Sequence, residues 1–94
     1  MLNATWLETF VTLAETGHFT RTAERLNMTQ PGVSQHLRKL ERQLGHALIA
    51  QDGKSFTLTA AGEALRELGL SRRREERQLR DVISADDANL GEVR

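Results

Sequence analysis

The sequence contains no cysteine, has few aromatic residues and carries no net charge over its 94 residues. Without cysteine there is no disulfide framework, no thiolate nucleophile and no cysteine-containing zinc site. No apolar run approaches the roughly 18 residues of a membrane span, and no signal-peptide pattern opens the chain. These absences favour a small cytoplasmic protein without a membrane partner. A core of about 60 residues buries only roughly 60% of its unfolded surface, so help from an oligomeric partner is expected.

Residues 29–44 predict a helix with two chemically different faces. Thr29 is a suitable N-cap, Pro31 is tolerated in the first turn, and Gly45 ends the helix. One face is an apolar stripe, and it consists of Val33, Leu37, Leu40 and Leu44. The opposite side carries Ser34, Gln35, Arg38, Lys39 and Arg42. Because amide and guanidinium groups reach base edges and phosphates, and one helix fits the major groove, this pattern favours sequence-specific DNA binding.

The flanking segments predict a winged helix-turn-helix over residues 1–58. Asn3 caps a helix over residues 4–15 that Gly17 ends, and Thr20 caps a second helix that runs to about Leu26. Residues 27–28 then turn the chain, since asparagine tolerates a positive φ. Two short strands at 47–51 and 54–58 flank Asp52-Gly53, a good hairpin signal. The expected fold is therefore mostly α, with three helices and a two-stranded wing.

A long helix is predicted over residues 59–85, beginning at the N-cap Thr59. Its apolar positions recur at roughly heptad spacing, and a lone helix cannot bury them, whereas two copies side by side can. The dimerisation residues expected on this basis are Leu65, Leu68, Leu79, Val82 and Ile83. The arginine- and glutamate-rich run 72–77, with pairs such as Arg72/Glu76, is interpreted as a solvated flank of the coiled coil. Residues 86–89 are expected to form a linker, and residues 90–94 the start of a strand.

Charge is distributed unevenly along the chain. Residues 18–54 carry six cations against three acids, whereas residues 1–17 carry two acids and no cation. The positive excess therefore lies on the segment that contains the candidate DNA-contacting helix. Because this excess is modest, we expect salt-sensitive DNA binding that depends on dimerisation.

Residues 4–66 resemble the N-terminal DNA-binding part of LysR-type transcriptional regulators. The resemblance is carried, in order and spacing, by Leu7, Phe10, Gly17-His18-Phe19-Thr20, Ala23, Leu26, Gln30-Pro31-Gly32-Val33-Ser34, Leu40-Glu41, Leu44-Gly45, Leu48 and Leu58-Thr59-Ala60-Ala61-Gly62. It departs from the family pattern at four positions, where His18 replaces a small residue, Thr22 an alanine, Ile49 a phenylalanine and Gln51 an arginine. The loss of a cation at Gln51 implies either a weaker contact of the wing with the DNA backbone or a contact that rests on Lys54.

The resemblance implies a transcriptional regulator that binds an inverted-repeat operator as a homodimer. It implies that the long helix links this domain to a C-terminal sensing domain, whose small-molecule effector would be absent from this fragment, and that the chain is truncated where that domain begins. No cofactor is expected in the fragment itself. A tetramer and contact with RNA polymerase are further expectations for a full-length protein.

The DNA-binding residues expected from the helix faces and the resemblance together are Thr20, Arg21, Thr29, Gln30, Pro31, Ser34, Gln35, Arg38, Arg42 and Lys54. For Thr20 and Arg21 the alternative role is capping and solvation, and for Lys54 it is a solvated hairpin lysine. No metal site is expected, because the three histidines lack ligand spacing, and surface exposure is expected for His36. No catalytic residues are expected either, since the neighbours Ser34-Gln35-His36 point apart. The alternative functions are a winged-helix protein-interaction module, which would favour exposed aromatic and aliphatic side chains, and, more remotely, an enzyme.

Overall fold

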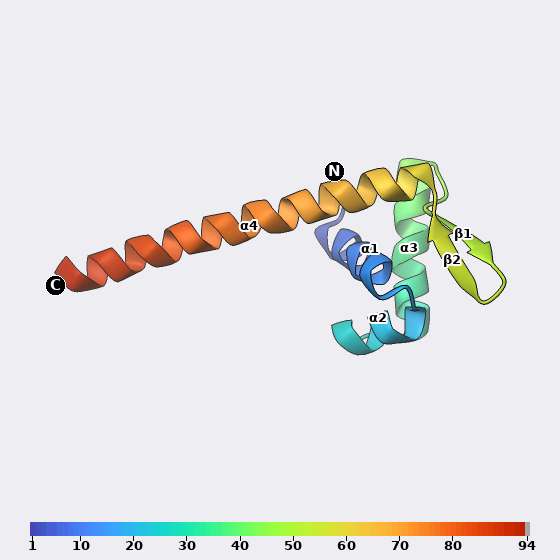
Figure 1. Ribbon diagram of the computed structural model, residues 1–94, viewed down its shortest axis with the longest axis horizontal. Helices are drawn as coiled ribbons and strands as arrows, with labels where there is room; N and C mark the ends of the chain where they lie inside the picture. The colour runs from blue at the N-terminus through green and yellow to red at the C-terminus, as the bar shows by residue number, and fades with distance from the viewer. Residues whose placement is uncertain (94) are drawn as a thin grey trace.

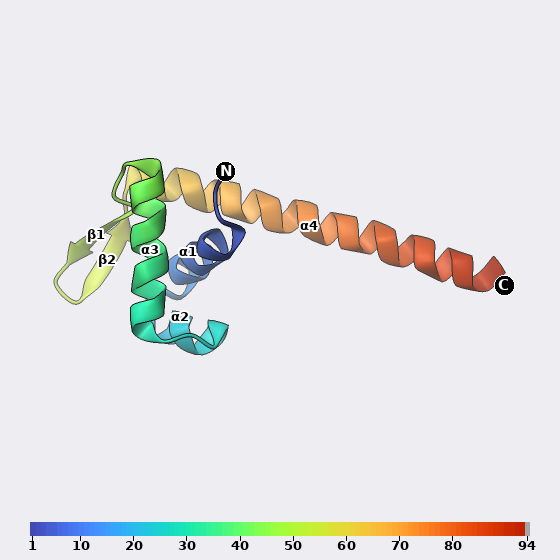
Figure 2. The same ribbon diagram turned by 180° about the vertical axis from the view of Figure 1, so that it is seen from behind.

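A bundle of three short helices carries a hairpin on one side and a long helix that projects far beyond it (Figures 1 and 2). The computed structural model describes the backbone of residues 1–93 and the side chains of residues 1–85. The elements, in order, are α1 (Ala4–Thr16), α2 (Phe19–Leu26), α3 (Gln30–Leu44), β1 (Ile49–Asp52), β2 (Ser55–Leu58) and α4 (Ala60–Val93). The predicted class, a mostly α winged helix-turn-helix followed by a long helix, is confirmed.

Local capping residues set the bounds of α1 and α3, as predicted. The Asn3 side chain accepts a hydrogen bond from the Trp6 amide at 3.1 Å, and Thr29 Oγ1 accepts one from the Gly32 amide at 3.1 Å. Both side chains satisfy first-turn amides that have no partner within the helix. At the other end of α3, Gly45 takes a left-handed φ of 74°, which favours glycine and stops the helix.

The start of α2 differs from the prediction. Thr20 does not cap this helix; its N-cap is His18, whose side chain makes no capping hydrogen bond. The turn is held instead by Thr16 Oγ1, which accepts from the His18 amide at 3.1 Å, and by Thr22 Oγ1, which donates to the His18 carbonyl at 2.8 Å. Because the Thr16 hydroxyl already fixes this turn, the N-cap lies two residues earlier than predicted, at His18, and Thr20 lies exposed in the first turn of α2.

The core lies between α1, α3, the root of the hairpin and the start of α4. From α3 it receives Val33, Leu37 and Leu40, which confirms most of the predicted stripe. Leu44 was also placed in the stripe, but it is 38% exposed. The chain turns away at Gly45, and the fully buried Leu48 enters the core next. The remaining core residues include Leu7, Phe10, Val11, Leu13, Ala23 and Leu65.

The hairpin is antiparallel and pairs Ile49 with Leu58 and Asp52 with Ser55. Its two-residue loop is therefore Gly53-Lys54, one position later than the predicted Asp52-Gly53. Gly53 has a φ of 64°, as required at the first central position of a type II′ turn. An edge contact between the rings of Phe19 and Phe56, with centroids 5.7 Å apart, joins the hairpin to α2.

The long helix α4 begins where Thr59 Oγ1 accepts from the Gly62 amide at 3.1 Å, as predicted. The prediction of a linker at 86–89 and a strand from residue 90 is wrong, because α4 continues to Val93. This stretch contains no proline, and its aspartate, asparagine and glycine residues each disfavour helix by only about 1 kcal/mol or less. Arg94 lies outside the described residues.

The first turns of α4 pack into the core of the same chain. Leu65 is only 5% exposed and belongs to the buried cluster, so its assignment to a dimerisation surface is wrong. Gly62 and Gly69 allow close approach: a Cβ on Gly62 would lie 2.1 Å from the Leu48 carbonyl oxygen, and one on Gly69 2.2 Å from Val11 Cγ2. These glycines, which look like weak points of a helix, are positions where α4 approaches the rest of the domain closely.

Candidate nucleic-acid interface

The buried stripe of α3 determines which of its side chains face outward. Since Val33, Leu37 and Leu40 point into the core, the polar residues on the other side project away from the domain. The outward-facing residues, here called the polar face of α3, are Gln30, Pro31, Ser34, Gln35, Arg38 and Arg42; all are exposed except the half-buried Ser34.

Three hollows on the surface bring together the predicted residues other than Thr29. The first lies on α3 and is lined by Gln30, Pro31, Ser34, Gln35 and Arg38. Gln30 also lines a second hollow, which Thr20 and Arg21 of α2 and Lys54 of the hairpin share. Arg38 and Arg42 line a third hollow at the C-terminal end of α3. Gln30 and Arg38 therefore join the three hollows into one surface that runs from the hairpin and the start of α2 along α3.

Two polar side chains, one at the N-cap of α3 and one on the helix, make contacts within the protein instead of adding to the polar face. The Thr29 hydroxyl, although exposed, is occupied by the Gly32 amide. Lys39 turns toward α1, where its ammonium group lies 5.3 Å from the centroid of the Trp6 ring, a cation–π distance. The polar face of α3 consequently presents two cations, Arg38 and Arg42, beside amide and hydroxyl groups.

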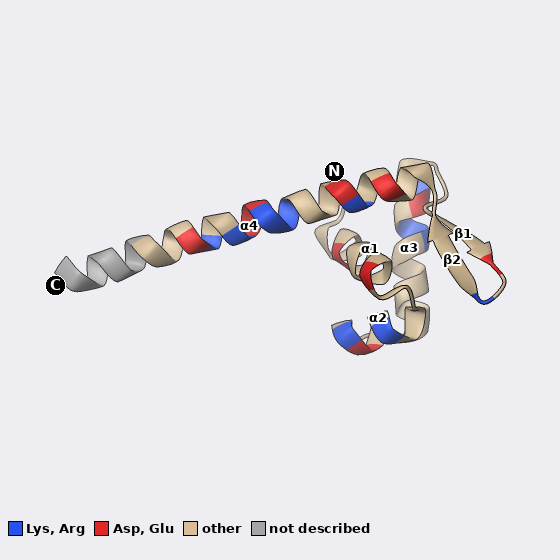
Figure 3. Ribbon diagram, viewed as in Figure 1, with Lys and Arg blue, Asp and Glu red and all other residues tan. Residues whose placement is uncertain are grey.

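Acidic and basic residues are unevenly distributed over the domain, although α2 also carries Glu24 between its two arginines (Figure 3). Lysine and arginine gather on α2 and the C-terminal half of α3, whereas α1 shows only acids. The Glu41 carboxylate, the acid of α3, accepts a hydrogen bond from the Leu48 amide at 2.9 Å and is thereby directed to the root of the hairpin. The surface formed by the three hollows thus keeps the positive excess that the sequence showed.

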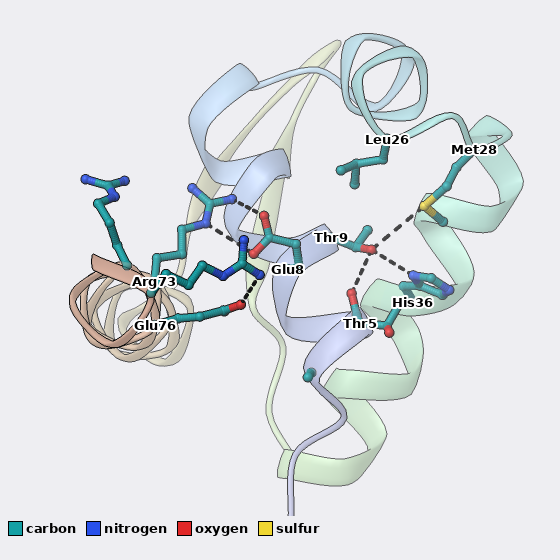
Figure 4. Close-up of a pocket in the computed structure, with 11 residues that line it drawn as sticks. Thr5, Glu8, Thr9, Leu26, Met28, His36, Arg73 and Glu76 are labelled. Carbon is teal, nitrogen blue, oxygen red and sulfur yellow. Dashed lines mark hydrogen bonds and ion pairs between the residues drawn. The ribbon is translucent and has the colours of Figure 1, made fainter. Parts of the chain in front are cut away.

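His36 lies behind the polar face rather than on the open surface where we expected it. Its Nδ1 is 2.8 Å from Thr9 Oγ1, which also donates to the Thr5 carbonyl and approaches Met28 Sδ (Figure 4). Partial burial lowers the pKa of His36, and the positive charge of Lys39 lowers it further. The contact joins α3 to α1, and no local sequence signal indicates it because the two residues lie far apart in the chain.

Arg73 of α4 was expected on a solvated flank, but it contacts α1 instead. Its Nε and Nη2 donate to the two oxygens of Glu8, at 3.1 and 2.5 Å (Figure 4), and Nη1 donates to Glu15 at 3.0 Å. The hydrogen bond to Glu8 raises the pKa of Arg73. The predicted pairing of Glu76 with Arg72 is replaced by one with Arg80, at 2.7 Å. The seven-residue spacing of Glu8 and Glu15 on α1 was the available signal for this site.

Beyond its buried first turns, α4 exposes apolar side chains on one side. Leu68 is 38% exposed, Ile83 49%, and Leu79 and Val82 58% each. We call these four residues the seam of α4. Among the residues that the structure describes, none of the helices combines the length and the apolar character of a membrane span. Over the same residues, no three histidine, aspartate or glutamate side chains gather as a metal-ligand set.

Comparison with known proteins places this arrangement among bacterial regulators. The family of bacterial regulatory helix-turn-helix proteins described as the lysR family matches residues 4–63. The chain is 36% identical over 84 residues to the HTH-type transcriptional regulator IlvY of Escherichia coli strain K12, which covers 89% of this chain and 28% of IlvY. The chain spans about a fifth to three tenths of the length of the curated relatives it matches.

Solved structures of such regulators share the fold. A crystal structure of a LysR-family transcriptional regulator from Eggerthella lenta has 48% identity and a TM-score of 0.66, over 72% of this chain and 96% of that one. Vibrio fischeri DarR, solved in complex with DNA, has 30% identity and a TM-score of 0.78, over 90% of this chain and 29% of DarR.

Proposed function

Because this chain belongs to the lysR family of bacterial regulatory helix-turn-helix proteins, we propose that it is a dimeric transcriptional regulator that binds specific sequences of double-stranded DNA. The observation that carries the proposal is the polar face of α3, which lies between the start of α2 and the hairpin. A protein-binding surface would favour exposed aromatic and aliphatic side chains, but this face offers amide, hydroxyl and guanidinium groups. DarR, a structural relative, was solved with DNA, which supports the same function here.

The polar face suggests how DNA would be recognised. With α3 in the major groove, the Gln30 amide is suited to adenine and the Arg38 guanidinium to guanine or a phosphate. Thr20 and Arg21 lie at the start of α2, where unpaired backbone amides favour a phosphate. Lys54 at the hairpin loop and Arg42 near the end of α3 would contact the DNA backbone on either side. Phosphate contacts would position the domain, and the contacts of α3 with the bases would select the sequence.

The seam of α4 supports a homodimer. Its four apolar side chains are exposed in the single chain, and an equivalent helix from a second copy would cover them. A two-fold dimer presents two identical copies of α3, so its target would be an inverted repeat with half-sites in successive major grooves. Leu65 takes no part in this contact, because it is buried in its own domain.

For the full-length protein we extend the proposal by family membership. Its relatives are transcriptional regulators rather than enzymes. We propose a cytoplasmic regulator whose additional domain binds a small-molecule effector, and which acts as a dimer or tetramer with RNA polymerase as a partner. The residues described here would supply the DNA-binding and pairing functions.

Selection from random duplex DNA tests the proposed function. We expect the purified chain to enrich one sequence arranged as an inverted repeat. A Gln30→Ala/Arg38→Ala double variant should lose this enrichment, because both side chains belong to the polar face of α3. The matched control is Arg66→Gln, which removes a cation whose ion pairs, with Glu63 and Glu67, are confined to α4. If the parent enriches no sequence, or if the double variant enriches the same sequence equally well, the proposal is wrong.

A further inference from the structure

The joint between α1 and α4 is held by charge and by shape at neighbouring points. Arg73 donates to Glu8 and Glu15 of α1, and its Nη2 also donates to Thr12 Oγ1 at 3.2 Å. One turn earlier on α4, Gly69 lies against Val11 of α1. The contacts are therefore made through successive turns on one side of α4, the side that faces α1. Figure 4 shows Arg73 reaching from α4 to Glu8.

The guanidinium of Arg73 restrains the direction of α4 because it reaches two separate points on α1. Glu8 and Glu15 are two helical turns apart, about 10 Å along the axis. A single ion pair would act as a pivot, whereas a planar fork held at both carboxylates resists rotation of one helix over the other. The ion pairs within α4, such as Glu76 with Arg80, cannot provide this restraint because both partners move together.

Gly69 fixes the distance between the same two helices. Val11 is almost fully buried, and its branched side chain has few alternative rotamers. A methyl group on Gly69 would lie 2.2 Å from Val11 Cγ2, so α4 would have to move outward or tilt. Together, the glycine permits close approach and the arginine sets the angle.

We propose that Arg73 and Gly69 are positioning residues that fix the angle at which α4 leaves the domain, and thereby set the half-site spacing that the dimer accepts. This inference rests on the proposed function, in which α4 joins the two copies. The 20 residues of α4 beyond Arg73 extend about 30 Å, so a tilt of about 10° at the joint moves the far end by about 5 Å. In a two-fold dimer this displacement occurs in both copies. The combined displacement is a substantial fraction of the roughly 34 Å between successive major grooves.

The first experiment measures the joint without DNA. Because the chain has no cysteine, Glu24→Cys on α2 and Gln78→Cys on α4 allow two spin labels on exposed positions. Diluting the labelled chain with unlabelled chain restricts the signal to distances within one protomer. We expect a narrow distribution of distances between the two labels in the parent, a broader distribution in Arg73→Gln and a shifted one in Gly69→Ala. An unchanged distribution in Arg73→Gln would overturn the role of Arg73 even if DNA binding proceeds as proposed.

The second experiment measures which spacing between DNA half-sites the dimer prefers. Affinities are compared for inverted repeats whose central spacer varies one base pair at a time, and for a duplex with a single half-site. We expect Arg73→Gln to keep the parent's affinity for the single half-site while its preference for the best spacer falls by about fivefold, the size expected for a network of partly exposed ion pairs. The spacer preference of Arg73→Lys should lie between those of the parent and Arg73→Gln, because lysine keeps the charge but lacks the planar guanidinium group.

Matched control variants distinguish the effect of the contact between α1 and α4 from the general effects of a substitution. Arg80→Gln removes an ion pair confined to α4 and should keep the parent's spacing profile. Adding Val11→Ala to Gly69→Ala should restore much of the parent's spacing profile, since it removes the methyl group that the new side chain would contact. A sharp parent profile that is unchanged in Arg73→Gln would overturn this inference alone. A parent that binds all spacers equally would overturn the proposed inverted-repeat recognition as well as the spacing role.

Discussion

His36 of α3 and Thr9 of α1 form a hydrogen bond of 2.8 Å behind the polar face of α3. The two residues join the helix that we propose enters the DNA to the helix that contacts α4. His36 therefore lies where its protonation would affect the packing of the domain rather than a contact with DNA.

The first prediction is that the domain loses stability in mild acid through His36. Its pKa is lowered in the folded chain, by partial burial and then by the charge of Lys39. The unfolded chain therefore takes up this proton at a higher pH, near the ordinary value of about 6.5. The contribution of neutral His36 to stability is present above that value and is lost as the pH falls through the lower pKa of the folded state.

Thermal unfolding of the parent and of His36→Gln, measured between about pH 7.5 and pH 5, checks this prediction. Glutamine can hydrogen-bond to Thr9 but does not titrate, so the parent should lose stability relative to the variant as the pH falls. Parallel curves for the two proteins would show that His36 does not contribute.

The second prediction separates base contacts from phosphate contacts on the polar face of α3. Gln30→Ala should weaken binding by about 1–3 kcal/mol and relax the preference at one base pair in each half-site. Arg42→Ala should weaken binding to all sequences alike and reduce the salt dependence. An operator panel at two salt concentrations distinguishes them. If Gln30→Ala binds every site as tightly as the parent, the proposed docking of α3 is wrong.

The third prediction compares two leucines of α3 that the sequence places in one stripe. Leu37 is buried and Leu44 is 38% exposed. Leu37→Ala should lower the free energy of unfolding by about 2–5 kcal/mol, as expected for a buried truncation that leaves a cavity. Leu44→Ala should lower it much less, because solvent already reaches this side chain. Denaturant unfolding of both variants gives the comparison, and equal losses would contradict the burial described here.

The fourth prediction concerns pairing through the seam of α4. Glutamate at both Leu68 and Leu79 should give monomers and weaken DNA binding, because paired helices would bury these charges. Gln78→Glu is the control, since it adds a negative charge at an exposed position outside the seam. Sedimentation gives the oligomeric state. A Leu68/Leu79 variant that remains dimeric would show that the copies pair elsewhere.

The fifth prediction tests the contact between α4 and the hairpin root. Gly62→Ala places a Cβ 2.1 Å from the Leu48 carbonyl oxygen, a backbone atom that cannot rotate away. The variant should lose about 1–3 kcal/mol of stability or more, despite the better helix propensity of alanine. Ala64→Gly, at an exposed position of the same helix, should cost only about 1 kcal/mol. Melting curves of both variants decide, and a stabilised Gly62→Ala would contradict the close approach.

Local chemistry determined what the sequence could predict. The ends of α1 and α3 followed from Asn3, Thr29 and Gly45, whose effects act within one turn of the chain. The polar face of α3 followed from the position of its apolar stripe. Both depend on residues only a few positions apart, and the structure confirms them except for Lys39, which turns toward Trp6.

Contacts between distant segments explain what the sequence did not predict. Arg73 looked like one member of a solvated arginine run because its partners, Glu8 and Glu15, are on another helix. Leu65 fits the heptad pattern, yet the surface it covers belongs to its own domain. The polar residues at 86–89 suggest a linker, but without a proline they do not stop α4, which continues past residue 85.

The packing of Leu65 and Gly69 has a consequence for recombination between regulators. Secondary structure changes at residue 59, which suggests a point at which to exchange the proposed sensing domain for that of another regulator. A crossover there would replace the turns of α4 that pack closely against Val11 and Leu48. The α1 of one protein would then have to pack against the α4 of another. We expect functional chimeras of this protein to carry their crossover beyond Arg73, so that the unit inherited with the DNA-contacting helix includes the base of α4.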